Sequence, residues 1–268
     1  MSSNGITIIL PVLNEAENLN FLIPELAEVA KNHYKENYEI AVVDDNSTDN
    51  TQDIVDKHLN RGVNILYRKR ENEKSLPESI FDGIKISNFS SVMWLDADGS
   101  MDSTSVNKLI SNFIKNENKV YIGSRFHKEG GYKGSEYIIE TNKVERVLKL
   151  INSEDSLIAI YLSIIFNKIL NLILNVGVKD LTSGFIVGKK AYFKEPMFSN
   201  HVYGEYFISV VTKLYINQIE IEEVGYYCLI RKYGKSKSSS SLIKMILLSK
   251  PYFSKALLAR KWINESKR

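Results

Sequence analysis

An α/β fold with a central, mostly parallel sheet flanked by helices is predicted by two features of the sequence. Short apolar runs rich in β-branched residues alternate with segments of helical periodicity in the first part of the chain, as in parallel sheets whose connections are helices. The chain has 268 residues, 44% of them hydrophobic, which suffices for a buried core without cross-links. Its single cysteine, Cys228, excludes a disulfide framework and a cysteine-based zinc site and is typical of a reducing compartment.

Each predicted strand is a short apolar run bounded by turn residues. The first run, ITIILPV, precedes a segment in which Leu19, Leu22, Leu26 and Val29 recur at the spacing of one helical face. The cluster DDNSTD follows the second run and leads into the next helix. The predicted strands are residues 6–12, 39–43, 63–67, 90–98, 120–123 and 219–224. The predicted helices are residues 15–32, 49–58, 75–87, 157–178 and 204–217.

The segment 157–178 is the most apolar part of the chain. Four polar residues interrupt it at the spacing of one helical face, which predicts an amphipathic helix. These residues are Asn167, Lys168, Asn171 and Asn175. The preceding segment, 126–156, is polar, contains glycines at its start and then becomes helical, which is typical of a flap over a site.

Positive charge is concentrated at the C-terminus. Residues 226–268 hold eleven Lys/Arg and one acid, whereas the rest of the chain holds 24 Lys/Arg and 31 acids, giving net charges of +10 and −7. We therefore predict a main domain, 1–240, and a basic amphipathic helical extension, 241–268. Apolar residues alternate there with Lys/Arg, which favours an anionic membrane surface over nucleic acid as the partner. A solvated helix docked on the body is the alternative.

Neither a secretory signal nor a transmembrane segment is predicted. The N-terminal apolar run is only as long as a strand and lacks a preceding basic region. No run reaches the ~18 uninterrupted apolar residues of a membrane span. We expect a cytoplasmic protein, bound peripherally to the cytoplasmic face of a membrane.

Carboxylates follow three of the predicted strands. Asp44 and Asp45 follow the second strand, Asp96 and Asp98 end the fourth, and Glu15 follows the first. Because ligands of open α/β sheets bind at the carboxyl ends of the strands, we expect four of these carboxylates to converge, and five if Glu15 turns inward. Converging carboxylates call for a divalent cation, and Mg²⁺ takes one or two of them together with substrate phosphates. The pattern predicts a metal-held nucleotide diphosphate, although each motif alone also fits a turn or a helix N-cap.

Motifs of several other enzyme classes are absent. No G-x-G-x-x-G follows a strand, which argues against a dinucleotide-dependent oxidoreductase. The sequence Gly234-Lys235-Ser236 imitates the end of a phosphate-binding loop, but Leu229 stands where the earlier glycine is required. No G-x-S-x-G nucleophile elbow is present.

The ordered motifs resemble those of glycosyltransferase family 2. They are ITIILPVLNEAENL, YEIAVVDDNSTDNT, VMWLDADGSMDS, IGSRF, DLTSGF and RKYGKSK, and they run from about residue 5 to residue 240. Within that family the chain is most similar to dolichol- and polyprenyl-phosphate sugar synthases, because of DLTSGF and the final basic motif. The resemblance implies the GT-A fold, a Rossmann-like fold of nucleotide-diphospho-sugar transferases.

The resemblance also implies roles for individual residues. On the donor side, the residues implied to hold the base, ribose and diphosphate are Pro11, Leu13, Glu15, Val43, Asp45, Asp96, Ala97 and Lys237. The residues implied to hold Mg²⁺ or Mn²⁺ are Asp96, Asp98 and, as a weaker third ligand, Ser100. Those implied to lie near the transferred sugar or the phosphate acceptor are Arg125, Asp180, Ser183 and Arg231.

Some positions depart from the family pattern. Family members that glycosylate a hydroxyl usually carry a Glu-Asp pair on a late helix, and here Glu205 is followed by Tyr206. The missing aspartate favours a phosphate acceptor, whereas Glu205 would be the base for a hydroxyl acceptor. Lys74 to Pro77 replace a Gly-Leu stretch, and the region between Gly134 and Ala159 is longer than in the family.

The function predicted from sequence is inverting transfer of a hexose from a GDP- or UDP-hexose to a polyprenyl phosphate, with Mg²⁺ or Mn²⁺. The first alternative is transfer to a glycan hydroxyl in the synthesis of a surface polysaccharide. A metal-dependent nucleotidyltransferase and a non-catalytic interaction module are more distant alternatives.

Overall fold

The computed structural model describes residues 3–71, 73–132, 157–201, 203–229, 233 and 242–267. The strands are β1 (Ser3–Val12), β2 (Tyr38–Asp44), β3 (Ile65–Lys69), β4 (Phe89–Trp94), β5 (Val120–Ser124), β6 (Gly131–Tyr132), β7 (Ile186–Lys189), β8 (Ile221–Gly225) and β9 (Tyr227–Cys228). The α-helices are α1 (Ala16–Tyr34), α2 (Thr51–Leu59), α3 (Leu76–Ile86), α4 (Ser103–Lys115), α7 (Leu157–Leu174), α8 (Tyr206–Ile216) and α9 (Leu242–Ser266).

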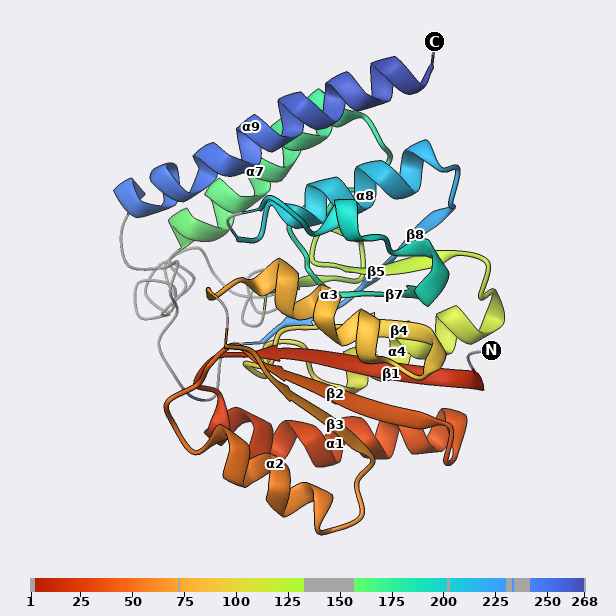
Figure 1. The fold of residues 1–268 in the computed structure, drawn as a ribbon. Coiled ribbons are helices and arrows are strands. Elements are labelled where there is room, and N and C mark those ends of the chain that lie inside the picture. The colour runs from red at the N-terminus through yellow and green to blue at the C-terminus, as the bar shows by residue number, and fades with distance from the viewer. Residues whose placement is uncertain are drawn as a thin grey trace, which may run out of the picture.

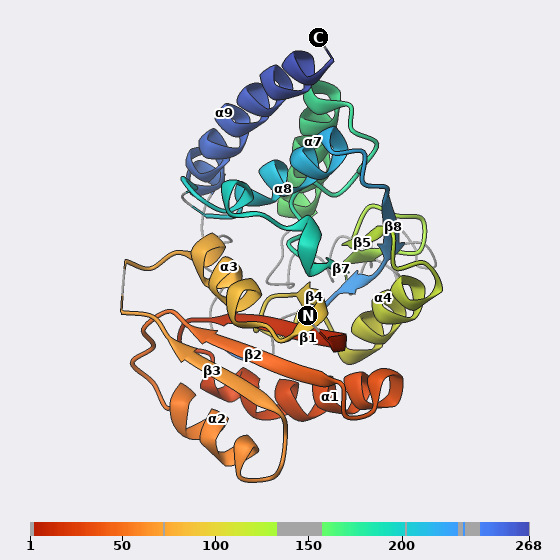
Figure 2. The same ribbon diagram turned by 45° about the vertical axis from the view of Figure 1, so that its right-hand side comes forward.

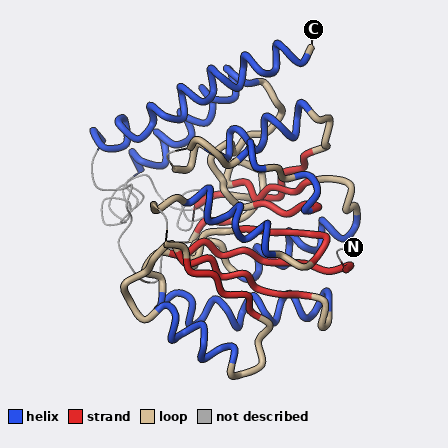
Figure 3. The backbone as a smooth tube through the Cα atoms, in the orientation of Figure 1, coloured by secondary structure: helices blue, strands red, loops and turns tan. Residues whose placement is uncertain are grey.

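A seven-stranded sheet of order β3-β2-β1-β4-β7-β5-β8 forms the centre of the molecule (Figure 3). Strand β7 pairs antiparallel with both of its neighbours, and the remaining pairs are parallel. The chain adds β2 and β3 on one side of β1 and then returns to place β4 on the other side. The order of the strands therefore reverses between β1 and β4, and such a switch point is where open α/β sheets bind ligands.

Helices cover both faces of the sheet (Figures 1 and 2). Side chains alternate along β1, so that Ile6, Ile8 and Leu10 join the core under α1, α2 and α4, while Ile9 joins the core under α3, α7, α8 and α9. Helix α3 lies close to the sheet because Gly83 leaves no side chain there, and an added Cβ would approach Ile9 to 2.4 Å. The predicted α/β fold with a mostly parallel sheet is confirmed.

Most predicted elements are present within a few residues of their expected bounds. Helix α4 and strand β7 are additional elements that the sequence patterns did not reveal. The suggested flap falls largely at 133–156, outside the described residues.

The predicted C-terminal extension contains α9, which packs along α7 and α8 (Figure 1). Its side chains Ala256, Ala259 and Ile263 are buried in the core. Arg260 donates to the carbonyl of Leu174 at the end of α7 (3.2 Å). None of the helices that the structure describes combines the length and apolarity needed to cross a bilayer.

Candidate active site

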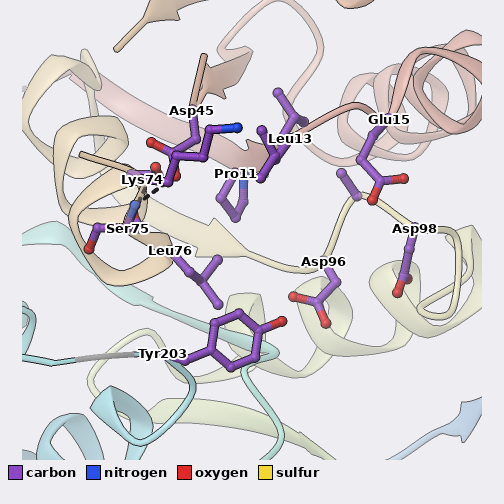
Figure 4. A pocket seen from close by; sticks show the side chains of 13 residues that line it. Pro11, Leu13, Glu15, Asp45, Lys74, Ser75, Leu76, Asp96, Asp98 and Tyr203 are labelled. Atoms are coloured by element: carbon purple, nitrogen blue, oxygen red, sulfur yellow. Dashed lines mark hydrogen bonds between the residues drawn. The ribbon is translucent and has the colours of Figure 1, made fainter. Parts of the chain in front are cut away.

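A cavity opens at the carboxyl ends of β1, β2 and β4, at the switch point of the sheet (Figure 4). Its volume is about 270 Å³, near the lower end of the ~300–1,000 Å³ usual for small-molecule sites. The lining residues are Pro11, Val12, Leu13, Glu15, Asp45, Lys74, Ser75, Leu76, Ser79, Asp96, Ala97, Asp98 and Tyr203. Seven of the residues assigned to the donor or the metal from sequence line this one cavity: Pro11, Leu13, Glu15, Asp45, Asp96, Ala97 and Asp98.

Asp45 is fixed at one end of the cavity by two donors. Arg70 Nη1 donates to its Oδ1 (2.6 Å), and the backbone N–H of Ser75 donates to its Oδ2 (2.7 Å). Lys74, which the resemblance left unassigned, lies at the same end of the cavity (Figure 4). The carboxylate of Asp45 is therefore held in one orientation and offers its remaining lone pairs to a ligand.

Arg70 is a buried cation that the sequence analysis missed. Its guanidinium also pairs with Glu78 (2.5 Å) and Asp82 (3.1 Å) of α3, and its side chain is 2% exposed. It stands within a run of charged residues that resembles a solvated loop. The sequence offered one indication that Arg70 is paired: Glu78 and Asp82 are four residues apart and therefore share one face of α3.

The expectation that Asp44 joins the convergent carboxylates was wrong. Its Oδ1 accepts the N–H of Ser47 (2.7 Å) and its Oδ2 accepts the hydroxyl of Tyr67 (2.7 Å). Ser47 in turn accepts the N–H of Asn14 in the loop after β1 (2.9 Å). Asp44 thus ties two loops of the cavity rim together, whereas Glu15 does turn toward the cavity.

Glu15, Asp96 and Asp98 lie around the other end of the cavity, and Asp96 is directed toward the ring of Tyr203 (Figure 4). The N–H of Ser100 donates to Asp98 Oδ1 (2.9 Å), and Gly99 provides the positive φ of that turn. No group of three or more His, Cys, Asp or Glu suited to a metal occurs among the described residues. Asp96 and Asp98 together fit Mg²⁺ or Mn²⁺, because such an ion takes one or two protein carboxylates and completes its shell with water and phosphate oxygens.

Three assigned residues do not line the cavity. Val43 is fully buried and packs in the core. Ser100 is buried, and its carbonyl accepts the N–H of Leu229 (2.8 Å). Ser183 donates its hydroxyl to the carbonyl of Gly123 and so joins the loop before β7 to β5.

Arg125 and Asp180 form a buried ion pair. Arg125 Nε donates to Asp180 Oδ2 (2.8 Å) and its Nη2 donates to Oδ1 (2.7 Å), while Nη2 also donates to Thr182 (2.8 Å). The side chain of Asp180 is 0% exposed and that of Arg125 is 15% exposed. Burial alone would lower the pKa of Arg125, but the adjacent carboxylate outweighs it and raises that pKa well above its usual value. Arg125 is therefore a permanent cation.

Glu205 and Tyr206 stand at the start of α8. Glu205 is buried, and its Oε2 accepts the N–H of Tyr203 (2.9 Å). The hydroxyl of Tyr206 accepts the indole N–H of Trp94 (3.0 Å). Burial, and then the charge of Asp96, raise the pKa of Tyr206 well above its usual value. Tyr206 thus remains a neutral phenol and cannot act as the base that an aspartate would provide.

Arg231 and Lys237, the two basic residues assigned to phosphate binding, lie outside the described residues.

The sheet order and the acidic cavity at its switch point are those of the nucleotide-binding class of α/β proteins. The chain belongs to glycosyl transferase family 2, whose family model matches residues 7–195. This membership favours a glycosyltransferase over the nucleotidyltransferase and the interaction module considered from sequence.

Two relatives illustrate the similarity in sequence. The chain is 33% identical over 125 residues to a dolichol-phosphate mannosyltransferase of Pyrococcus furiosus, covering 47% of this chain and 34% of that protein. It is 30% identical over 115 residues to an uncharacterized glycosyltransferase of Mycobacterium tuberculosis, covering 43% of this chain and 46% of that protein. The chain thus matches less than half of the length of these relatives.

Solved structures share the fold at low sequence identity. Glucosyl-3-phosphoglycerate synthase from Mycobacterium tuberculosis, crystallised with Mn²⁺, UDP and glucosyl-3-phosphoglycerate, has a TM-score of 0.62 at 14% identity, over 97% of this chain and 81% of that chain. Mannosyl-3-phosphoglycerate synthase from Rubrobacter xylanophilus has a TM-score of 0.59 at 15% identity, over 99% of this chain and 76% of that chain. These similarities confirm the predicted GT-A type of fold.

Proposed function

We propose that this protein is an inverting glycosyltransferase that moves a hexose from a nucleotide diphosphate sugar, GDP- or UDP-linked, to a polyprenyl phosphate. The observation that carries the donor half is the convergence of Asp45, Asp96 and Asp98 on one cavity at the switch point of the sheet. A relative named as a dolichol-phosphate mannosyltransferase supports the acceptor half.

In the proposed donor complex the nucleotide lies along the cavity. Asp45, held by Arg70 and Ser75, accepts a hydrogen bond from the base, and Pro11 and Leu13 line the space for the base and ribose. Val43 supports this wall from the core. Asp96, Ala97 and Glu15 line the opposite end, where the ribose and diphosphate would lie.

A bound Mg²⁺ or Mn²⁺ would neutralise the diphosphate, and Asp96 and Asp98 are the residues that would hold it, with Ser100 behind them. Arg231 and Lys237 are proposed to contribute further positive charge to the phosphates. An acceptor phosphate oxygen attacks the anomeric carbon from the face opposite the diphosphate. The new carbon–oxygen bond forms as the old one breaks, and the electron pair leaves on the nucleoside diphosphate.

This reaction needs no general base, because a phosphate acceptor is already ionised near neutral pH. The residues at the start of α8 agree with that requirement: Tyr206 is a neutral phenol, and Glu205 is engaged with the N–H of Tyr203. The permanent cation Arg125 would position the acceptor phosphate, with Asp180 holding its guanidinium and Ser183 holding the neighbouring loop. A lipid acceptor further implies that the enzyme works on the cytoplasmic face of a membrane.

The donor half is tested by calorimetric titration with UDP, GDP and their hexose conjugates, with and without Mn²⁺. We expect one nucleotide to bind only with metal, and Asp98→Ala to weaken that binding at least about tenfold by removing one of two carboxylate ligands. Asp56→Ala, an exposed change on α2, is the matched control and should bind as wild type does. Absence of binding by every nucleotide diphosphate, with and without Mn²⁺, would contradict the proposal.

Transfer to a glycan hydroxyl remains the second candidate, because a carboxylate, Glu205, occupies the start of α8. A general base contributes about 10²–10⁴-fold to the rate of such a transfer. With a phosphate acceptor, Glu205→Gln should therefore leave kcat within about tenfold of wild type, whereas a hydroxyl acceptor predicts a fall of ~10²-fold or more. Single-turnover assays with polyprenyl phosphate and with a glycan, on variants whose melting temperatures are matched, separate the two outcomes.

A further inference from the structure

Helix α7 directs two of its polar residues, Asn167 and Asn171, toward the loop before β7, whereas Lys168 is exposed. Asn167 is buried, its Nδ2 donates to Thr182 (3.1 Å), and its Oδ1 accepts the N–H of Leu181 (3.0 Å). Asn171 donates to the carbonyl of Lys179 (2.9 Å). Two of the four polar residues that made 157–178 amphipathic in sequence, Asn167 and Asn171, therefore bind the loop before β7.

The opposite side of α7 exposes large apolar residues. Ile165, Ile169 and Leu172 are 50%, 40% and 84% exposed, and their spacing of four and then three residues places them on one face. Leu257 and Leu258 on the neighbouring helix α9 are 64% and 42% exposed. We call these five residues the α7–α9 face.

The two helices that carry these residues pack against each other. The ring of Phe166 on α7 packs against Tyr252 and Phe253 of α9, with ring centroids 5.6 and 5.2 Å apart. Together with the bond from Arg260 to the end of α7, these contacts fix the helices side by side, as both ribbon views show (Figures 1 and 2). Apolar side chains that gather on a surface indicate an interaction site, whereas single exposed apolar residues are common and need no such explanation.

The charge around the α7–α9 face selects the kind of partner. Lys168 of α7 and Lys250, Arg260 and Lys261 of α9 are exposed, and Glu265 is the one acid in the sequence of either helix. A second copy packed by a twofold axis would bring these cations against their own equivalents, which is unfavourable. An apolar face with a basic border instead matches a bilayer that contains anionic lipids.

We propose that the α7–α9 face docks on an anionic lipid bilayer, with its isoleucines and leucines entering the headgroup boundary. The proposal rests on the proposed lipid acceptor and adds the surface that brings the enzyme to it. Asn167 on the inner side of α7 binds Thr182, which in turn binds Arg125. One helix, about 10 Å across, therefore separates the docking surface from the cation proposed to receive the acceptor phosphate.

Co-sedimentation with vesicles tests the docking surface without a catalytic assay. Wild type should sediment with vesicles of mixed phosphatidylglycerol and phosphatidylcholine, and less with phosphatidylcholine alone. Leu172→Glu should weaken binding to the mixed vesicles by roughly tenfold or more, because it replaces a leucine that would enter the anionic bilayer with an anion. Leu59→Glu is the matched control, since Leu59 is an exposed leucine of α2 (38%) on the other face of the sheet.

Each other outcome overturns the proposal. Wild type that stays in solution with the mixed vesicles, or Leu172→Glu that sediments as wild type does, would remove the bilayer as the occupant. A wild-type dimer in lipid-free sedimentation velocity, converted to a monomer by Leu172→Glu, would instead assign the face to a second copy. Leu172→Glu and Leu59→Glu are also titrated with UDP or GDP and Mn²⁺. If a variant loses vesicle binding but still binds the nucleotide, the result concerns the docking surface and not the proposed transferase function.

Discussion

Replacing Arg70 with methionine is expected to lower the free energy of unfolding by about 3–5 kcal/mol, the usual cost of removing one partner from a buried ion pair. Methionine fills much of the same volume but leaves the carboxylates of Asp45 and Asp82 without their shared cation. Urea denaturation followed by circular dichroism measures the change. Nucleotide affinity should also fall, because Asp45 loses the donor that fixes its Oδ1.

Arg68→Met is the matched control for this experiment. Arg68 lies on β3, two residues before Arg70, and its side chain is 49% exposed with a contact of 3.7 Å to Asp82. An exposed ion pair of this kind contributes about 0–1 kcal/mol. Equal effects of the two substitutions on stability would contradict the view that Arg70 is the cation around which the acids of this region are arranged.

Asp180→Asn is expected to cost a similar ~3–5 kcal/mol. The amide keeps the shape of the side chain and one acceptor oxygen, but it leaves the guanidinium of Arg125 buried without a counter-charge. It also removes the acceptor that Arg125 Nε now uses. The melting temperature should fall by roughly 6–20 °C, at about 2–4 °C per kcal/mol for a domain of this size.

Glu129→Gln makes the same chemical change in an exposed ion pair. Lys108 and Glu129 are 2.9 Å apart, with side chains 40% and 57% exposed. The expected loss is below about 1 kcal/mol. If Asp180→Asn and Glu129→Gln have the same melting temperature, the buried pair does not contribute the expected stability. Arg125 would then be free to move toward a ligand.

The repeating strand-and-helix pattern was sufficient to predict the sheet and the location of the site. Strand β1 could be assigned from a single β-branched run, and the position of Asp45, Asp96 and Asp98 directly after strands was sufficient to bring them together. This works because parallel strands end at a common edge, so residues distant in sequence converge once the strand order is known.

Residues whose roles depend on a partner elsewhere in the chain were harder to assign. Asp44 and Asp45 are adjacent and chemically identical, yet one closes a loop and the other lines the cavity, because successive side chains of an extended segment point to opposite sides. Arg70 resembled a surface charge until α3 brought Glu78 and Asp82 against it.

By itself the sequence determined the α/β architecture, the family and the edge of the sheet at which the acidic residues meet, because each of these follows from local periodicity and from order along the chain. Only the tertiary structure decided the orientation of helix α7. Asn167 and Asn171 bind the loop around Asp180, and Ile165, Ile169 and Leu172 face outward. Periodicity defines two faces of a helix, but the unpaired backbone and side-chain groups of its neighbours determine which face is turned inward.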